Sequence, residues 1–280
     1  REGDKECSIC HTSSVELKLY GDTGSLACHM CDSLYHLGEV LVQPEESVLG
    51  IAEKQEILEM LPSIPIYGGN GTNLYVASKR KLEELGSGAI WKHIYVINES
   101  ETGSKVASRL WIADYVSRKS NGEVYTFEDL AQMSGSEKVG MQRLGVLRAD
   151  VDNLGLAFIS GFISNTKENP YHFNTFSRYA DLSRALSMFF KVGVNKIVSG
   201  NVNGVEDRKD TYRLWSGDTS EKGHIHIIYS GGDDVFLVGP WDELIEGAIE
   251  IRNWLKDLTG GNITMSAGLG MFTHNFPITK

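Results

Sequence analysis

Hydrophobic residues recur at strand or helix spacing most clearly in the second half of the chain. The predicted elements are a strand at 142–152, a helix at 176–193, strands at 224–230 and 234–240, a helix at 241–260 and a strand at 262–272. Gly231-Gly232 lies between the two middle strands, which indicates a β-hairpin. This strand-helix-strand-strand-helix-strand order predicts an α+β fold of the ferredoxin-like type, with one antiparallel sheet and both helices on one face.

The first half contains shorter patterns. They predict a helix at 51–62, two strands within 63–78 around a Gly-rich turn, a helix at 79–86 and a strand at 89–98. Thr126 is a candidate helix N-cap because Asp129 follows three residues later. We therefore expect three segments: a four-cysteine module at 1–40, a small α+β domain at 41–140 and the ferredoxin-like domain at 141–280.

The charge of the chain argues against broad nucleic-acid binding, which depends on basic surface. The 280 residues carry a net charge of −10, of which −8 falls in residues 1–140 and −2 in residues 141–280. No apolar run approaches about 18 residues, so no transmembrane helix and a cytoplasmic location are expected. The chain starts without methionine or an apolar signal core, which indicates an excerpt of a longer polypeptide.

All four cysteines occur as two Cys-x-x-Cys pairs, Cys7/Cys10 and Cys28/Cys31. This spacing is typical of a zinc site, and four thiolates would complete the tetrahedron and leave no open position for catalysis. We therefore predict one structural zinc ion that folds residues 1–40. Two disulfides in a secreted protein are the alternative. The nearby histidines that offer substitute ligands are His11, His29 and His36.

Adjacent carboxylates at the hairpin tip call for a physical explanation. Asp233 and Asp234 follow the two glycines, and two like charges about 4 Å apart repel by roughly 4 kcal/mol at an effective dielectric of 20. In the predicted topology the first strand is adjacent to the hairpin. That strand ends in Asp150 and Asp152, so several carboxylates converge at one edge of the sheet.

A pair of divalent cations would neutralise these carboxylates, and the metal-bound cluster would then serve catalysis. Hard cations such as magnesium take oxygen ligands, and two of them can clamp the attacking and leaving oxygens of a phosphoryl transfer. Gly231 and Gly232 lack side chains, so phosphates can approach the backbone. We assign Asp150 and Asp233 as ligands and Asp234 as a second ligand or a residue that holds the turn. Asp152 is either part of the site or a structural hydrogen-bonder.

These residues resemble the second palm domain of the large subunit of type III-A (Csm) CRISPR effector complexes. The resemblance rests on "GVLRADVDNLG", "FSRYADLSRALSMFF", "YSGGDDVFLVGPWDELIEGA" and "ITMSAGLG". The paired cysteines, the small α+β unit and "FEDLAQMS" resemble the zinc-bearing domain that precedes this palm. Together the two resemblances cover essentially the whole chain.

The resemblance implies that the chain belongs to an antiviral enzyme that converts ATP into cyclic oligoadenylates with magnesium or manganese when its complex binds target RNA. The implied catalytic residues are Asp150, Asp233 and Asp234. The candidate sets are Asp150, Val151, Asp233 and Asp234 for the catalytic metal, and Ser230, Gly231, Gly232, Asn153 and Ser183 for the nucleotide. The implied partners are ATP, the other domains of the large subunit, and other Csm subunits with CRISPR RNA and target RNA, with no membrane.

Some parts of the family pattern are missing from this sequence. No His-Asp dipeptide occurs, so we expect the nuclease domain to be absent, together with the first palm and the helical C-terminal domain. The chain alone is therefore expected to be inactive. The alternatives are a diguanylate-cyclase-like enzyme, whose turn normally continues with Glu-Phe where this chain has Asp234-Val235, a non-catalytic palm scaffold in a ribonucleoprotein, and a zinc-ribbon RNA binder, which the acidic first half opposes.

Overall fold

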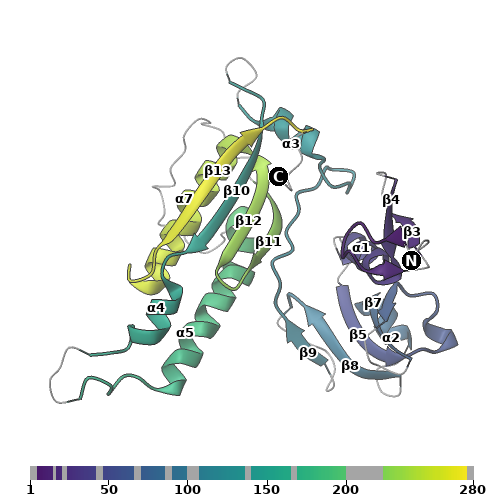
Figure 1. The fold of residues 1–280 in the computed structure, drawn as a ribbon, viewed down its shortest axis with the longest axis horizontal. Helices are drawn as coiled ribbons and strands as arrows, with labels where there is room; N and C mark the ends of the chain where they lie inside the picture. The colour runs from purple at the N-terminus through teal and green to yellow at the C-terminus, as the bar shows by residue number, and fades with distance from the viewer. Residues whose placement is uncertain are drawn as a thin grey trace. The chain divides into compact units, whose positions relative to one another are not determined.

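The structure is a computed structural model that describes residues 5–14, 17–20, 24–41, 47–65, 71–85, 90–99, 107–135, 140–164, 169–199 and 223–275. The chain forms two compact units, residues 1–110 and 111–280 (Figure 1). This division ends at residue 110 and not at the expected boundary of 140, because the segment after residue 110 packs with the second unit. The expected boundary at residue 40 stays a prediction.

The first unit contains a five-stranded sheet with the strand order β6-β7-β5-β8-β9. Its elements are β5 (Ser47–Glu53), a 3-10 turn (Glu56–Leu58), β6 (Ser63–Pro65), β7 (Thr72–Ser78), α2 (Lys79–Leu85), β8 (Trp91–Ile97) and β9 (Ala107–Leu110). The pairs are antiparallel except for β8 with β9. Tyr75, Trp91 and Ile94 are buried in its core.

The predicted helix at 51–62 is wrong. Residues up to Glu53 lie in β5, the central strand, and only Glu56–Leu58 form a helical turn. The strand period begins before residue 51, because Val48, Gly50 and Ala52 are buried in alternation. The strands within 63–78, the helix at 79–86 and the strand at 89–98 are confirmed, whereas most of the Gly-rich turn lies outside the described residues.

The cysteine-bearing part of this unit consists of short elements. They are β1 (Lys5–Glu6), β2 (Ser13–Ser14), β3 (Leu17–Tyr20), β4 (Ser25–Cys28) and α1 (His29–Leu41). β1 pairs with β2 and β3 pairs with β4, both antiparallel. Among the residues described here, the buried cluster consists of Cys7, Ala27 and Cys31, with Leu17 and Cys28 partly buried against it. So small a core needs another source of stability.

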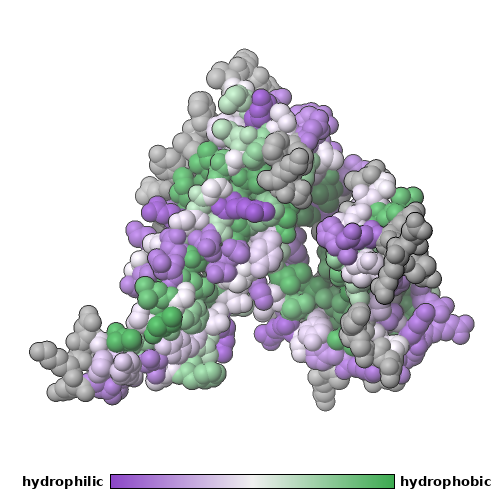
Figure 2. Space-filling model, viewed as in Figure 1, coloured by the Kyte–Doolittle hydropathy of each residue, from purple (hydrophilic) through white to green (hydrophobic). Residues whose placement is uncertain are grey.

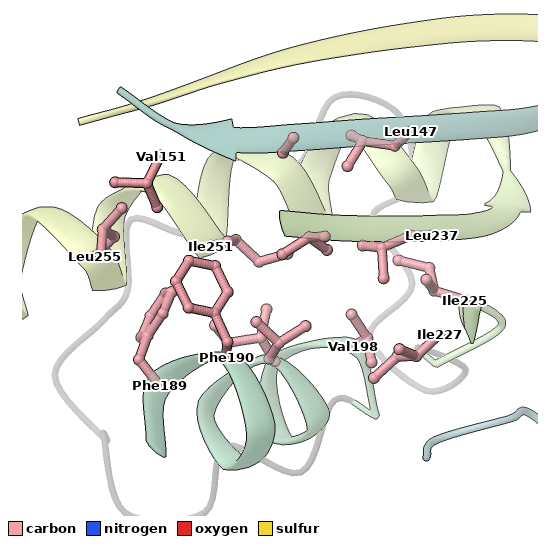
Figure 3. Close-up of a cluster of buried hydrophobic side chains, with 14 of the residues drawn as sticks. Leu147, Val151, Phe189, Phe190, Val198, Ile225, Ile227, Leu237, Ile251 and Leu255 are labelled. Atoms are coloured by element: carbon pink, nitrogen blue, oxygen red, sulfur yellow. The ribbon is translucent and has the colours of Figure 1, made fainter. Parts of the chain in front are cut away.

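The second unit contains a four-stranded antiparallel sheet with the order β11-β12-β10-β13. The strands are β10 (Leu144–Val151), β11 (His226–Gly231), β12 (Asp234–Pro240) and β13 (Met265–Phe272). One sheet face is packed against α5 (Phe176–Met188), a π-helical turn (Phe189–Gly193), α6 (Val194–Val198) and α7 (Trp241–Thr259). Leu147 and Leu237 of the sheet meet Phe190 and Ile251 of the helical layer in this core (Figure 3).

The opposite face of this sheet is covered only in part. Helix α3 (Phe127–Met133) begins with a capping box in which Thr126 and Asp129 bond to each other, as expected. Its Leu130 packs against Leu144 and Val238. Leu144 begins β10 and Val238 lies near the end of β12, so α3 covers one end of the face and leaves the end of β10 at Asp150 open. Figure 2 shows hydrophobic and strongly hydrophilic residues side by side on this unit.

The predicted elements of the second unit are found with shifted boundaries. The helix predicted at 176–193 changes to a π turn at Phe189 and continues through α6 to Val198, and the last strand begins at Met265. A short helix, α4 (Leu154–Ser160), was not predicted. The polar stretch 200–222 lies outside the described residues. Within the described part of the chain, no helix has the length and apolar character needed to cross a membrane.

The contact between β10 and α7 gives a prediction about stability. A Cβ atom on Gly145 would lie 2.6 Å from Leu244 Cδ1 and 2.7 Å from Trp241 Cα. Because the second neighbour is backbone, Gly145→Ala should lower the free energy of unfolding by about 1–3 kcal/mol. Gly268→Ala on β13 is the matched control, since nothing lies within 4 Å of its Cβ position. Urea denaturation measures both, and equal stabilities would contradict the close packing of α7 on β10.

Candidate functional site

Three carboxylates meet where β10 ends beside the β11–β12 hairpin. The strand register pairs Asp150 with Asp234, and Gly231 with Asp234. Carboxylate oxygens of Asp150, Asp233 and Asp234 lie within 4.8 Å of one another. Asp150 and Asp234 are exposed and Asp233 is partly buried. The structure therefore brings together the three acids that the sequence predicts as catalytic.

The hairpin tip is a tight turn tied to the central strand. β11 ends at Gly231 and β12 begins at Asp234, so Gly232 and Asp233 form the tip. Gly232 has a φ of +68°, a conformation that glycine adopts without strain. The backbone N–H of Val151 donates to the carbonyl of Asp233 at 3.2 Å. This bond fixes the tip, and with it the Asp233 side chain, against the end of β10.

The two glycines of the turn differ in accessibility. Gly232 is exposed and has nothing within 4 Å of its Cβ position. Gly231 is buried: the Tyr229 hydroxyl lies 3.6 Å from its Cβ position and donates to its carbonyl at 3.1 Å. Gly232 is therefore the glycine at which a phosphate can approach the backbone directly.

The electrostatics of the acid cluster favour a cation. Loss of solvent around Asp234 raises the pKa of its carboxyl, and the neighbouring charges of Asp150 and Asp233 raise it further. Arg148 acts in the opposite direction. An all-oxygen, negatively charged donor set suits magnesium or manganese, which relieve this repulsion when they bind. The residues present thus fit a divalent metal centre.

Asp152 is occupied by structural hydrogen bonds. Its carboxylate accepts from the hydroxyls of Ser266 at 2.6 Å and Thr264 at 2.7 Å, and these bonds lower the pKa of its carboxyl. Its backbone N–H also donates to the carbonyl of Thr264 at 2.8 Å. Asp152 therefore ties the end of β10 to β13, which is the structural alternative left open by the sequence.

Beyond Asp152 lies a pocket of about 580 Å³ between α4, α5 and the end of α7. Asn153, at its rim, is exposed, has a φ of 53° and precedes the first residue of α4. The wall on α5 consists of Leu182, Ala185 and Leu186, whereas Ser183 is exposed and does not line the pocket. The sequence does not predict α4, because its seven residues are too few to show a helical period.

Two further candidates have backbone or core roles in the structure. Ser230 is 8% exposed and its hydroxyl donates to the carbonyl of Phe190 at 2.7 Å, so it joins β11 to the π turn. The Val151 side chain is 3% exposed and belongs to the hydrophobic core. Only the backbone carbonyl of Val151 offers an oxygen to a metal ion.

The four cysteines form a second possible metal centre. Their sulfur atoms lie within 4.8 Å of one another, and all four are free thiols. Cys10 Sγ and Cys28 Sγ are 3.7 Å apart, close to the roughly 3.8 Å edge of a tetrahedron with Zn–S bonds of about 2.3 Å. Cys7 lies after β1, Cys28 ends β4 and Cys31 lies in the first turn of α1. The donor set therefore fits zinc.

The thiols of this cluster are not equivalent. Backbone hydrogen bonds from Cys10 and Cys28 lower the pKa of Cys7 to about 6, whereas burial raises the pKa of Cys31 to about 12.

Charged side chains lie close to the sulfur cluster. Lys18 and His36 lie 3.6 Å from the carboxylate of Asp32, a residue that is 8% exposed next to Cys31. None of the three histidines considered as substitute ligands joins the four-sulfur group among the described residues.

The second unit has the features of a palm domain: an antiparallel sheet, helices on one face, and carboxylates where the central strand meets a hairpin. Residues 143–280 match the family described as Cas10/Cmr2, second palm domain. The chain belongs to the Cas10/Csm1 family of subtype III-A, because nearly its whole length aligns with curated members of that family.

The curated relatives and the similar solved structures indicate the same family. The chain is 32% identical over 279 residues to the CRISPR system single-strand-specific deoxyribonuclease Cas10/Csm1 (subtype III-A) of Mycobacterium tuberculosis, covering 100% of this chain and 31% of the relative. It is 36% identical over 278 residues to that of Thermococcus onnurineus, covering 98% and 32%. The chain thus spans about a third of the length of the curated relatives it matches.

Among solved structures, a Csm1-Csm4 subcomplex of the type III-A interference complex is similar with a TM-score of 0.65 and 29% identity, covering 88% of this chain and 31% of the other. A Csm1-Csm4 cassette in complex with cA3 has a TM-score of 0.64 and 29% identity, covering 88% and 30%. Another cassette of this kind was solved in complex with AMPPNP.

The cysteine geometry predicts one zinc ion per chain. Cys28→Ser should abolish stoichiometric zinc and unfold the short elements around it, because their buried cluster is too small to hold them. His29→Ala is the matched control and should retain zinc, since this exposed side chain is outside the sulfur cluster. Elemental analysis and hydrogen exchange measure both effects. Zinc retained by Cys28→Ser, or disulfides found by non-reducing mass spectrometry, would contradict the assignment.

The raised pKa of Asp234 predicts how stability responds to charge and metal. A folded-state pKa above the unfolded value means that protonation stabilises the fold, so the charged carboxylate costs stability at neutral pH. Asp234→Asn should therefore keep or raise the melting temperature without divalent ions. Magnesium should raise the melting temperature of the natural protein but not of the variant, and its effect should weaken as pH falls.

Differential scanning fluorimetry with and without magnesium measures this. Asp181→Asn on α5 is the control, because its exposed carboxylate lies outside the cluster and the variant should respond to magnesium normally. An equal response of Asp234→Asn to magnesium would exclude Asp234 as a ligand.

Proposed function

We propose that this chain is a metal-dependent nucleotidyltransferase palm that converts ATP into cyclic oligoadenylates within a type III-A CRISPR complex. The observation that carries the proposal is the convergence of Asp150, Asp233 and Asp234 within 4.8 Å. Similar structures that hold cA3 and AMPPNP support adenine nucleotides as ligands. They favour ATP over the GTP of a diguanylate cyclase.

The three acids would hold magnesium or manganese, which when bound neutralises charge on the attacking and leaving oxygens. In the proposed step, the 3′-oxygen of one ATP forms a bond to the α-phosphorus of another. The bond from that phosphorus to the bridging oxygen breaks, pyrophosphate leaves, and the hydroxyl proton passes to water. The open backbone at Gly232 leaves room for the phosphates.

The pocket between α4, α5 and α7 is the proposed place for the adenosine of one nucleotide. Its volume of about 580 Å³ is in the usual range for small-molecule sites. Apolar walls from Leu182, Ala185 and Leu258 suit the flat base, and Asn153 and Asn262 offer polar contacts at the rim. The pocket adjoins Asp152, which places it next to the acid cluster along β10.

The remaining partners follow from the family. We propose that the chain acts with the other domains of its large subunit and with Csm subunits that carry CRISPR RNA and target RNA. Csm4 accompanies Csm1 in the similar structures, which supports this.

Zinc at the cysteine cluster would be structural, because four thiolates close its coordination sphere. The second nucleotide needs a further wall, so the chain alone should bind ATP weakly and make little product.

The test is the double variant Asp233→Ala/Asp234→Ala in the complete complex. It should abolish cyclic oligoadenylate synthesis, a loss of at least about 100-fold, while assembly stays intact, because both acids lie at a hairpin tip and their removal leaves no core cavity. Product analysis by chromatography with ATP or GTP as substrate measures the loss and the base preference. Asp181→Ala is the control. Undiminished product from the double variant would overturn the proposed function.

A further inference from the structure

The segment that follows β9 lies as a strap against the second unit. This strap, residues 111–117, forms neither helix nor strand, yet none of its residues is exposed. Ala113 and Tyr115 pack against the hydrophobic core, and Ser117 is 3% exposed. Because the strap belongs to no helix or sheet, its backbone groups must find partners on the elements around it.

One side chain, that of Asn195 on α6, holds the middle of the strap. Its Oδ1 accepts from the backbone N–H groups of Asp114 and Tyr115, both at 3.1 Å. Its Nδ2 donates to the carbonyl of Ile112 at 3.2 Å and to the carboxylate of Asp114 at 2.9 Å. An asparagine amide has two donor hydrogens and two acceptor lone pairs. All the hydrogen bonds that this amide can make therefore go to the strap.

The strap is also bonded to β11 and to the residues just before it. The backbone N–H of Ile227 donates to the carbonyl of Tyr115 at 2.9 Å, and the Tyr115 hydroxyl donates to the carbonyl of Gly223 at 2.6 Å. Ser117 Oγ and His226 Nε2 are 2.8 Å apart, and both residues are buried. The strap thus joins α6 to β11.

These contacts close a ring of hydrogen-bonded elements that reaches the hairpin. The Ser230 hydroxyl donates to the carbonyl of Phe190 in the π turn, and Asn195 follows Phe190 by five residues, the span of one π-helical hydrogen-bonded loop. The ring runs from the strap through Asn195 and the π turn to Ser230, and back along β11 to the strap. Inside it, the pairing of β11 with β12 shifts between Ile227 and Tyr229, where the ladder is disrupted. The ring therefore supports β11 where the sheet supports it least.

The ring ends next to the acids. Ser230 directly precedes the two glycines of the turn, and the carbonyl of Asp233 at the tip accepts from the N–H of Val151. Asn195 itself belongs neither to the acid cluster nor to the wall of the pocket. A misplacement of reacting groups by about 1 Å can cost about 100-fold in rate. Support of the hairpin therefore matters for chemistry at the acids.

We propose that Asn195 is a positioning residue for the acid cluster: by holding the strap against α6 and β11, it fixes the hairpin that carries Asp233 and Asp234. The strap follows directly on β9, the last strand of the first unit. The segment that enters from the first unit is in this way part of the support for the acids of the second. The inference rests on the proposed function for its activity measurement and on structure alone for its hydrogen-exchange measurement.

The test uses the complete subunit in its assembled complex. Asn195→Ala should lower kcat for oligoadenylate synthesis about tenfold or more and leave the KM for ATP within about twofold, because the acids are misplaced while the groups that contact the nucleotide remain. Hydrogen exchange of the Val151 amide, which bonds to the hairpin tip, should become faster. Exchange in the first half of β10, outside the ring, should not change.

A charge exchange separates positioning from general stability. Asn195→Asp keeps an acceptor for the strap N–H groups but sets a second carboxylate against that of Asp114, so it should lower kcat and speed Val151 exchange. Adding Asp114→Asn puts the donor on the other side of the same contact. The double variant Asn195→Asp/Asp114→Asn should therefore recover a substantial part of both losses. This comparison also serves if Asn195→Ala does not assemble.

Asn121→Ala is the matched control. The Asn121 side chain donates to Glu123 at 2.9 Å and accepts from its backbone N–H at 3.0 Å, so the variant loses comparable hydrogen bonds in a turn outside the ring. It should leave kcat and Val151 exchange within about twofold.

Unchanged kcat and unchanged Val151 exchange in Asn195→Ala would overturn the inference. A loss of kcat that tracks a lower melting temperature, with Val151 exchange unchanged and no rescue by the double variant, would show a purely structural role and would overturn it as well. Full activity of Asp233→Ala/Asp234→Ala would instead remove the proposed function, and the exchange measurement would then decide on Asn195 by itself.

Discussion

The register between β10 and β12 determines which residues of the second unit meet. A shift of one residue would turn every side chain of β10 to the other face, because strand side chains alternate. In the observed register, Leu147 and Val151 are in the helical core while Arg148 and Asp150 are on the open face. The apolar face fixes this choice through burial, so the hydrophobic core holds three mutually repelling carboxylates together.

The sequence could predict this part of the site because its signals are local. Alternation along β10 and the two glycines of the hairpin specify strands and a turn, and adjacency of the first strand to the hairpin follows from the order of elements. The cysteine cluster could be predicted for the same reason, since each Cys-x-x-Cys pair sets two ligands within one turn. The capping box at Thr126 depends on residues only three positions apart.

Features that depend on tertiary contacts could not be read from the chain. The run from residue 51 has helix-forming residues, yet pairing with β7 and β8 draws Ile51 and Ala52 into a central strand. The irregularity in β11 that turns Tyr229 to the open sheet face has no sequence signature. Without it, Tyr229 would face the helical core and Ser230 would lie on the open face. The role of Asp152 was undecided because its partners, Thr264 and Ser266, come from more than a hundred residues away.

The hydrogen bond from Ser230 to Phe190 makes the hairpin and the helical layer mechanically continuous. Phe190 is the second residue of the π turn that continues α5, whose Leu182, Ala185 and Leu186 line the pocket. A π turn holds one more residue per hydrogen-bonded loop than an α-helical turn, and such turns inside helices are frequent at functional sites. The carbonyl that anchors β11, one residue before the glycines, therefore belongs to the same helical segment as the wall of the pocket. The pocket and the acids at the hairpin tip are in this way joined through α5, one π turn and one hydrogen bond.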